Sequence, residues 1–194
     1  VRPERFKPIA SLDFGEIQTN WKLLIENYVE PYHVQFLHAT TTDQPLLAHS
    51  TIVDDLCLGS TVKIPARNAG ESSAKVGQVL DVNSRFLTLF PNFVVGFYEP
   101  DQIGVHLNVP VRPGVTRQRR VIYHLHGDVM DDAEIQRLKD LWYRVHKEDH
   151  WACERLQAGR GSKVADAGGV LSPHWETPVR RFQELVLERC GGSS

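Results

Sequence analysis

The chain has 194 residues, 41% of them hydrophobic and 24% charged, which is the composition of a globular fold with one sizeable core. Its formal net charge of -2 gives neither a basic surface for nucleic acid nor a polybasic patch for a membrane. No apolar run approaches the roughly 18 residues of a membrane span, and the N-terminus lacks a secretory pattern. We therefore expect a single cytoplasmic domain over residues 1–194, with no nucleic-acid or membrane partner.

The N-terminal part of the chain is predicted to lead into one short helix. Residues 1–15 contain two prolines and little periodicity, so we expect a lead-in or the remnant of a linker. A helix is predicted from Trp21 to Val29, with Thr19 or Asn20 as its N-cap. Pro31 lacks the N–H that would continue this helix, so the backbone is expected to kink or widen there.

The middle of the chain is rich in β-strand signals separated by turns. We expect a loop over residues 40–50, with His49 solvated, and a mobile excursion over Pro65 to Lys75 between two strands. The expected strands are Leu56 to Ile64, Val79 to Val82, Arg85 to Phe90, Phe93 to Glu99, Ile103 to Pro110 and Gln118 to His126. They predict an antiparallel meander. His106, His124 and His126 lie within these strands. Lining of a pocket is one interpretation, but exposed or hydrogen-bonded strand histidines are commoner, and we assign them no role.

Two helices are predicted in the last third of the chain. Asp131 and Glu134 have the spacing of a capping box, and the helix that they open should run to about Gln157. On a wheel of ~100° per residue its apolar residues form one stripe: Leu138, Leu141, Trp142, Val145, Ala152 and Leu156. A closing helix is expected to start with Thr177 as its cap and Pro178 in the first helical position.

One acid of the long helix is predicted to lie on its buried face rather than on its solvated face. Asp149 falls inside the apolar stripe, whereas Glu148 falls on its margin and Glu154 on the far side. A run of charges is usually a solvated face, but that explanation does not account for an aspartate on the buried side. Asp149 is therefore a candidate for a buried functional site.

The stretch Asn20 to Thr42 carries further titratable groups among apolar and aromatic residues. Burial of Glu30, His33 and His38 there is unfavourable unless a metal, an ion pair or hydrogen bonds compensate for it. The alternative is a pair of hydrogen-bonded core histidines. Together with Asp149, the two histidines would form a set of two imidazoles and one carboxylate.

Such a set suits a metal that activates a small molecule. It leaves half of an octahedral Fe(II) coordination sphere open for dioxygen and substrate, although the same ligands could hold catalytic zinc with an activating water. The two histidines are five residues apart, whereas the HExxH zinc helix places them four apart. The spacing thus argues against that zinc motif and requires a distorted segment to bring both rings to one centre.

The sequence motif in this stretch resembles that of a known family. NWK, then EN, then an acid three residues before YH, then a second histidine five residues later resembles the catalytic domain of Rieske-type non-haem iron oxygenases, the ring-hydroxylating alpha subunits. The resemblance implies that His33, His38 and Asp149 bind mononuclear Fe(II), with Glu154 at the matching offset after the aspartate. It also implies that Glu30 links a ligand histidine to a Rieske histidine of the neighbouring subunit.

The resemblance carries further expectations. It places Asn27 near the open side of the iron, although hydrogen bonding within the helix end explains Asn27 equally well. It implies an α+β helix-grip fold, in which an antiparallel sheet curls around a long C-terminal helix. The implied activity is O2-dependent mono- or dioxygenation of an aromatic or other small organic substrate, in a homotrimer supplied with electrons by a reductase or ferredoxin.

The cysteines show that a Rieske cluster must come from elsewhere. Cys57, Cys153 and Cys190 are widely spaced and read as reduced thiols. No Cys-x-His or Cys-x-x-His pair is present, and the [2Fe-2S] centre needs both pairs. We therefore expect the cluster in a partner or in a preceding segment; the start at Val1 is equally compatible with processing or an alternative start codon.

Two other classes of function stay open at this stage. A non-catalytic helix-grip domain that binds an apolar ligand would contain no metal. A zinc hydrolase would keep its activity without oxygen and reductant.

Overall fold

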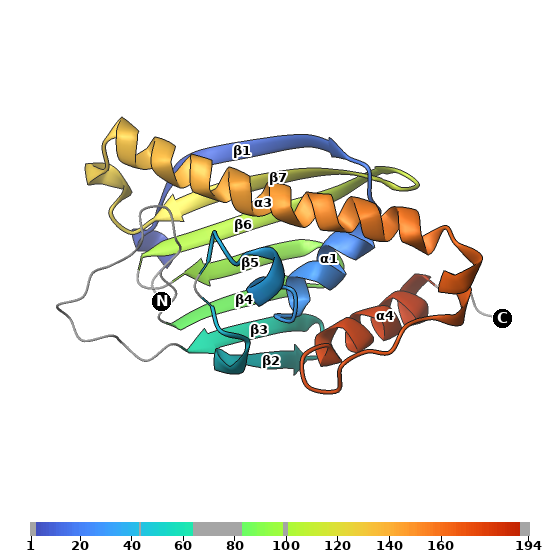
Figure 1. The fold of residues 1–194 in the computed structure, drawn as a ribbon. Helices are drawn as coiled ribbons and strands as arrows, with labels where there is room; N and C mark the ends of the chain where they lie inside the picture. Colours follow the sequence, from blue (N-terminus) through green and yellow to red (C-terminus); the bar gives the residue numbers. More distant parts are fainter. Residues whose placement is uncertain (1–2, 43, 64–82, 99–100, 191–194) are drawn as a thin grey trace.

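Seven antiparallel strands form one sheet in the computed structural model, which describes residues 3–42, 44–63, 83–98 and 101–190. The strand order is β1-β7-β6-β5-β4-β3-β2, so every strand after β1 lies beside its neighbour in sequence, and β1 adds to the far edge (Figure 1). The strands are β1 (Lys7–Ile17), β2 (His49–Asp54), β3 (Cys57–Lys63), β4 (Asn83–Leu89), β5 (Phe93–Tyr98), β6 (Gln102–Arg112) and β7 (Val115–His124).

The helices gather on one face of this sheet. They are α1 (Trp21–Val29), α2 (Val34–Leu37), α3 (Asp132–Arg160) and α4 (Thr177–Cys190), with short 3-10 turns at Pro3–Arg5, Leu46–Ala48, Gly127–Val129 and Lys163–Ala167. In Figure 1 the long helix α3 lies over the β1 side, α4 lies at the β2 and β3 side, and α1 lies between them. This arrangement confirms the expected α+β helix-grip fold.

Alternation along the strands directs two kinds of side chain toward the helices. On β7, for example, Gln118, Arg120 and Ile122 are buried on the helix side, while Arg117 and Arg119 are exposed on the other. This follows from the period of two in a strand. The inner face therefore carries polar groups as well as apolar ones, and the polar ones lie near the middle of the sheet.

Two apolar clusters hold the helices to the sheet. One joins α3 to the β1 side and comprises Leu12, Phe14, Tyr98, Ile122, Leu141, Trp142 and Val145. The other joins α1 and α4 to the opposite side and comprises Ile25, Val29, Leu58, Val94, Val179, Phe182 and Leu185. A third, smaller cluster of Ile17, Leu24 and Cys153 joins α1 to α3, so the positions of these two helices relative to each other are also fixed by apolar packing.

Two segments expected to be irregular are strands. Residues 7–17 form the edge strand β1 rather than a lead-in, and the signal was the alternation of buried Leu12 and Phe14 with exposed Ser11 and Asp13. His49 begins β2 instead of ending a loop, and its side chain is buried. The expected strand at 79–82 and the expected excursion at 65–75 lie outside the described residues.

The predicted helices agree closely with the structure, and only the stripe of α3 shifts. Asn20 caps α1 by accepting a hydrogen bond from the Lys22 N–H, and Asp131 and Glu134 form the expected capping box of α3. Along α3 the buried residues are Leu141, Trp142, Val145, His146, His150 and Cys153, whereas Leu156 is half exposed. The stripe drifts because α3, at 29 residues, extends past the cluster that covers its first half.

None of the helices among the described residues combines the length and the apolar character needed to cross a membrane.

Phe182 tests the packing that fixes α1 and α4. Its ring is fully buried and meets Trp21 edge-on at 5.9 Å between centroids. Phe182→Ala should lower the free energy of unfolding by about 3–5 kcal/mol, because it removes buried area and leaves a cavity. Leu187→Ala, at an exposed position of the same helix, should change it by less than about 0.5 kcal/mol in the same urea titration. Equal effects of the two substitutions would contradict the proposed packing.

Candidate metal centre

The break after α1 sets the positions of the two histidines. Glu30 is extended before Pro31, which ends α1, and the four-residue helix α2 follows. His33 is the residue before α2 and His38 the residue after it. The sequence prediction that a distortion is needed is confirmed, but the idea of one bent helix is wrong: a separate turn of helix replaces its continuation.

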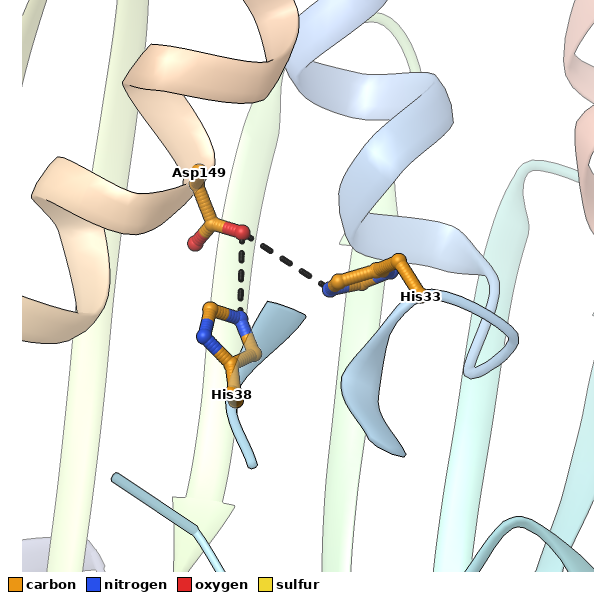
Figure 2. Close-up of side chains that lie close together, drawn as sticks. All are labelled: His33, His38 and Asp149. Carbon is orange, nitrogen blue, oxygen red and sulfur yellow. Dashed lines mark ion pairs between the residues drawn. The ribbon is translucent and has the colours of Figure 1, made fainter. Parts of the chain in front are cut away.

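Asp149 on α3 meets both histidines across the gap between α3 and the α1–α2 segment. Its Oδ1 lies 3.1 Å from Nε2 of His38 and 3.7 Å from Nε2 of His33. One donor atom from each of the three residues lies within 4.8 Å of the others. Figure 2 shows one carboxylate oxygen of Asp149 directed at the two rings, which stand at a steep angle to each other.

A carboxylate contacts the back of each histidine ring. Glu30 Oε1 lies 2.6 Å from Nδ1 of His33, and Glu148 Oε2 lies 2.7 Å from Nδ1 of His38. In a neutral imidazole that donates from Nδ1, the Nε2 atom carries a lone pair and can bind a metal. Both carboxylates thus select the tautomer that presents Nε2 to the common point, as outer carboxylates do around metal-bound histidines.

Asn27 and Thr41 complete the hydrogen bonding around the acids. The amide of Asn27 donates to Oδ1 of Asp149 at 2.8 Å, and the hydroxyl of Thr41 donates to Oε2 of Glu148 at 2.7 Å. Oε2 of Glu30 accepts from the backbone N–H groups of Tyr32 and His33. Each acid is therefore held in one orientation by neutral donors.

The charges of the site favour a bound cation. Burial alone would lower the pKa of His38, but the carboxylates of Asp149 and Glu148 raise that pKa to about 10. Burial alone would raise the pKa of Asp149, but His38, His33 and the Asn27 amide hold it well below its usual range. Without a metal, a proton on His38 occupies the centre, and a metal ion must displace it.

The donor set fits mononuclear iron. Two imidazole nitrogens and one carboxylate oxygen converge from different elements, and such a set leaves open positions on Fe(II). The three expected ligands, His33, His38 and Asp149, are all brought together by the fold. Their assignment as iron ligands stays a prediction that this geometry supports.

A cavity extends from the three residues into the space between α3 and the sheet. Beyond Asn27 and Glu30, it reaches inner-face side chains of five strands: Ser60, Phe86, Tyr98, His106 and Arg120. His49 also borders the cavity, and its two ring nitrogens have no hydrogen-bond partner among the described residues. The expectation that His49 is solvated is therefore wrong, because β2 turns its ring inward.

Sequence reasoning missed several polar residues of the site. Glu148 was predicted to lie on the margin of the apolar stripe of the helix, with no role, yet its carboxylate contacts His38. His106 and Arg120 are directly paired neighbours on β6 and β7, so they share the inner face. Strand alternation around Arg120 could have identified it, since it lies between Gln118 and Ile122 in the same inward series.

Glu30 also borders a groove on the outside of the molecule. This groove, which we call the α1–α3 groove, is bordered by Glu30, His33, Phe36, Trp151, Arg155 and Leu156, among other residues. Phe36 is 70% exposed and Trp151 54% exposed. Exposed apolar side chains that gather in one groove, rather than singly, can mark a surface where another protein binds.

Comparison with known proteins now places the chain in a family. The family model for the ring hydroxylating alpha subunit (catalytic domain) matches residues 6–192. The chain belongs to this family. Ring-hydroxylating alpha subunits are oxygenases that combine mononuclear iron with a Rieske cluster, so the cofactors expected from the sequence are those of the family.

Individual relatives of the ring-hydroxylating domain agree with this placement. Choline monooxygenase, chloroplastic, of Arabidopsis thaliana is 30% identical over 179 residues, which cover 88% of this chain and 39% of that protein. The solved quaternary ammonium Rieske monooxygenase CntA has a TM-score of 0.75 at 20% identity, over 95% of this chain and 50% of that one. Dicamba monooxygenase has a TM-score of 0.67 at 16% identity, over 98% and 61%. This chain thus spans between 39% and 61% of the length of these proteins.

Removal of the Asp149 carboxylate tests the ligand set. Asp149→Ala should lose the stoichiometric iron that the purified protein is expected to bind, about one ion per chain, because two imidazoles alone hold Fe(II) weakly. Asp140→Ala removes an exposed acid of the same helix that accepts a hydrogen bond from Gln136 and should keep its iron. Metal analysis after anaerobic loading measures both. Full iron retention by Asp149→Ala would refute the set.

Glu148 provides a second test, one that the sequence did not suggest. Glu148→Gln removes the charge that holds Nδ1 of His38, and iron affinity should fall about 10- to 100-fold. Glu184→Gln, at a surface ion pair of α4, should leave the affinity unchanged in the same chelator competition. An unaltered affinity in Glu148→Gln would show that its contact with His38 is incidental.

Proposed function

We propose that this chain is the catalytic part of an iron-dependent Rieske-type oxygenase that hydroxylates a small organic substrate with O2, by mono- or dioxygenation. The observation that carries this proposal is the convergence of two Nε2 atoms and one carboxylate oxygen within 4.8 Å, at the end of a cavity. Aromatic hydroxylation is one possibility within this proposal. The predicted cytoplasmic location stays a prediction.

The chain's own residues prepare the site for such chemistry. Bound Fe(II) would supply the activation of dioxygen at open coordination positions. Glu30 and Glu148 orient the two imidazoles, and Asn27 fixes the oxygen of Asp149 that faces them. Tyr98, Trp142 and Val145 of the first apolar cluster line the inner cavity and would limit the access of bulk water to a reactive centre.

Electrons are proposed to enter at Glu30. This residue is 9% exposed and borders both the inner cavity and the α1–α3 groove. A Rieske domain of a neighbouring subunit, seated on Phe36 and Trp151 in that groove, would place a cluster histidine within hydrogen-bond distance of this carboxylate. Such an arrangement needs an assembly of several copies, and a homotrimer is the form that we propose.

Two alternatives have less support. A domain that only binds an apolar ligand does not explain why two carboxylates orient histidines around one point. A zinc hydrolase could use the same three ligands, but membership in a family of oxygenases favours iron.

Glu30→Gln tests the electron route separately from iron binding. Gln keeps the length of the side chain but loses the negative charge on Nδ1 of His33, so iron affinity should fall as it does in Glu148→Gln, and the variant is saturated with iron before the assay. The charge that would bind a cluster histidine is lost in the same change. With NADH, a reductase and a Rieske protein as donors, oxygen-dependent turnover should fall about tenfold or more. The measurement is product formed per bound iron in single and multiple turnover.

Glu26→Gln is the matched control, because Glu26 lies on α1 four residues before Glu30 and borders the same groove without touching a predicted ligand. It should keep near-normal turnover. Turnover by Glu30→Gln at the unmodified rate would exclude this route. Turnover that needs neither O2 nor a reductant, or a protein that binds zinc but no iron, would refute the oxygenase itself.

A further inference from the structure

Arg120 places a permanent positive charge at the inner end of the cavity. Its side chain is fully buried, yet it borders the same cavity as His33, His38 and Asp149. Arginine stays protonated in proteins. Among the described residues Arg120 has no carboxylate partner, and its Nε and Nη2 atoms have no hydrogen-bond acceptor.

The surroundings hold the guanidinium in one plane. Cζ lies 3.5 Å from the centroid of the Trp142 ring and 5.2 Å from that of Tyr98. A Cβ at Gly104 would lie 2.2 Å from Nη2 and 2.6 Å from Cζ, so only glycine leaves room for the group on the sheet side. The guanidinium therefore lies between the Trp142 ring and the backbone of β6, with its Nε–Nη2 edge unpaired.

The neighbours of this cation are uncharged. Nη1 contacts Nε2 of His106 at 2.6 Å and Nε2 of His146 at 3.3 Å. Since arginine only donates, both nitrogens must accept, and burial together with the adjacent cation holds the pKa of each histidine well below its usual value. None of the described side chains in contact with Arg120 thus carries a negative charge, and a buried cation without a paired anion is unfavourable.

We propose that Arg120 is the binding residue for a carboxylate group of the substrate. The Nε and Nη2 donors form the side-on edge with which arginine binds a carboxylate through two parallel hydrogen bonds. A small shift of the side chains around this edge would admit the carboxylate, and the rest of the substrate would extend along the cavity toward the predicted iron ligands. This inference rests on the proposed function and specifies its substrate class.

The same geometry disfavours a substrate that is only cationic. A quaternary ammonium group is usually bound on aromatic faces, but the guanidinium already covers the Trp142 ring and lies near Tyr98. A second cation there would meet a like charge in a low-dielectric space. A substrate with a cationic end therefore also needs its own carboxylate to be accepted.

Four ligands of nearly the same shape distinguish the effect of a carboxylate from that of a cationic head group. Tert-butylacetate and neohexyl alcohol share an uncharged head and differ in carboxylate against hydroxyl. Glycine betaine and choline repeat that pair with a trimethylammonium head. Calorimetric titration of the iron-loaded protein should show each carboxylate binding about tenfold or more tightly than its alcohol. Equal affinities within the pairs, or tightest binding of choline, would overturn the proposal.

Two variants assign the preference to Arg120. Arg120→Met should reduce the carboxylate-to-alcohol ratio to near one, and Arg120→Lys, which keeps the charge but not the paired donors, should lose most of it. If Arg120→Met does not fold, the affinity ratio of Arg120→Lys is compared with that of the unmodified protein, and this comparison tests the assignment. A ratio that survives both changes would refute the assignment. Because binding needs no reductant, failure here is distinguishable from an absence of oxygenase turnover.

Discussion

His33 and His38 can offer their Nε2 atoms to one point only because a carboxylate holds the opposite nitrogen of each ring. Glu30 does this within the break after α1, and Glu148 does it from α3, more than a hundred residues later. Loss of either contact would free a ring to rotate or to change its tautomer. The site therefore depends on how α3 is placed against the α1–α2 segment, and the apolar clusters between the helices and one face of the sheet fix that placement.

The long helix α3 supplies several layers of the site in succession. Trp142 covers the guanidinium of Arg120, His146 contacts its Nη1, and one turn later Glu148 and Asp149 face the histidines. A helix of this length holds these groups at fixed intervals, since each residue advances the axis by about 1.5 Å. The substrate end and the metal end of the cavity are thereby set by one rigid element.

Charge divides the cavity into two regions. Near the predicted iron ligands, acids gather around a place for a cation, whereas the inner end holds a cation surrounded by neutral groups. A bound iron ion would satisfy the first region and a substrate carboxylate the second. In this view the two unsatisfied charges specify the two kinds of ligand that the cavity takes.

Local sequence patterns were enough to predict α1 and its cap, the capping box of α3, the antiparallel meander and the inward direction of Asp149. Each depends on residues close together in the chain, through caps, turns or a helical period. The resemblance of the NWK, EN and YH motif to the family predicted that the two histidines and Glu30 belong to one site. The edge strand β1 was missed, although Leu12 and Phe14 alternate with polar residues, because the prolines before them suggested a linker.

The sequence by itself thus determined the helices, the antiparallel strands and the inward direction of Asp149, because their signals are periodic or contiguous, and the family resemblance in the sequence supplied the fold class and the set of candidate ligands. Only the tertiary structure decided that Glu148 orients His38, that His49 faces inward and that Arg120 lies unpaired beneath Trp142. Those contacts join residues from separate elements, and whether a charged or imidazole side chain is paired, exposed or enclosed depends on what the fold packs against it. No spacing along the chain records that information.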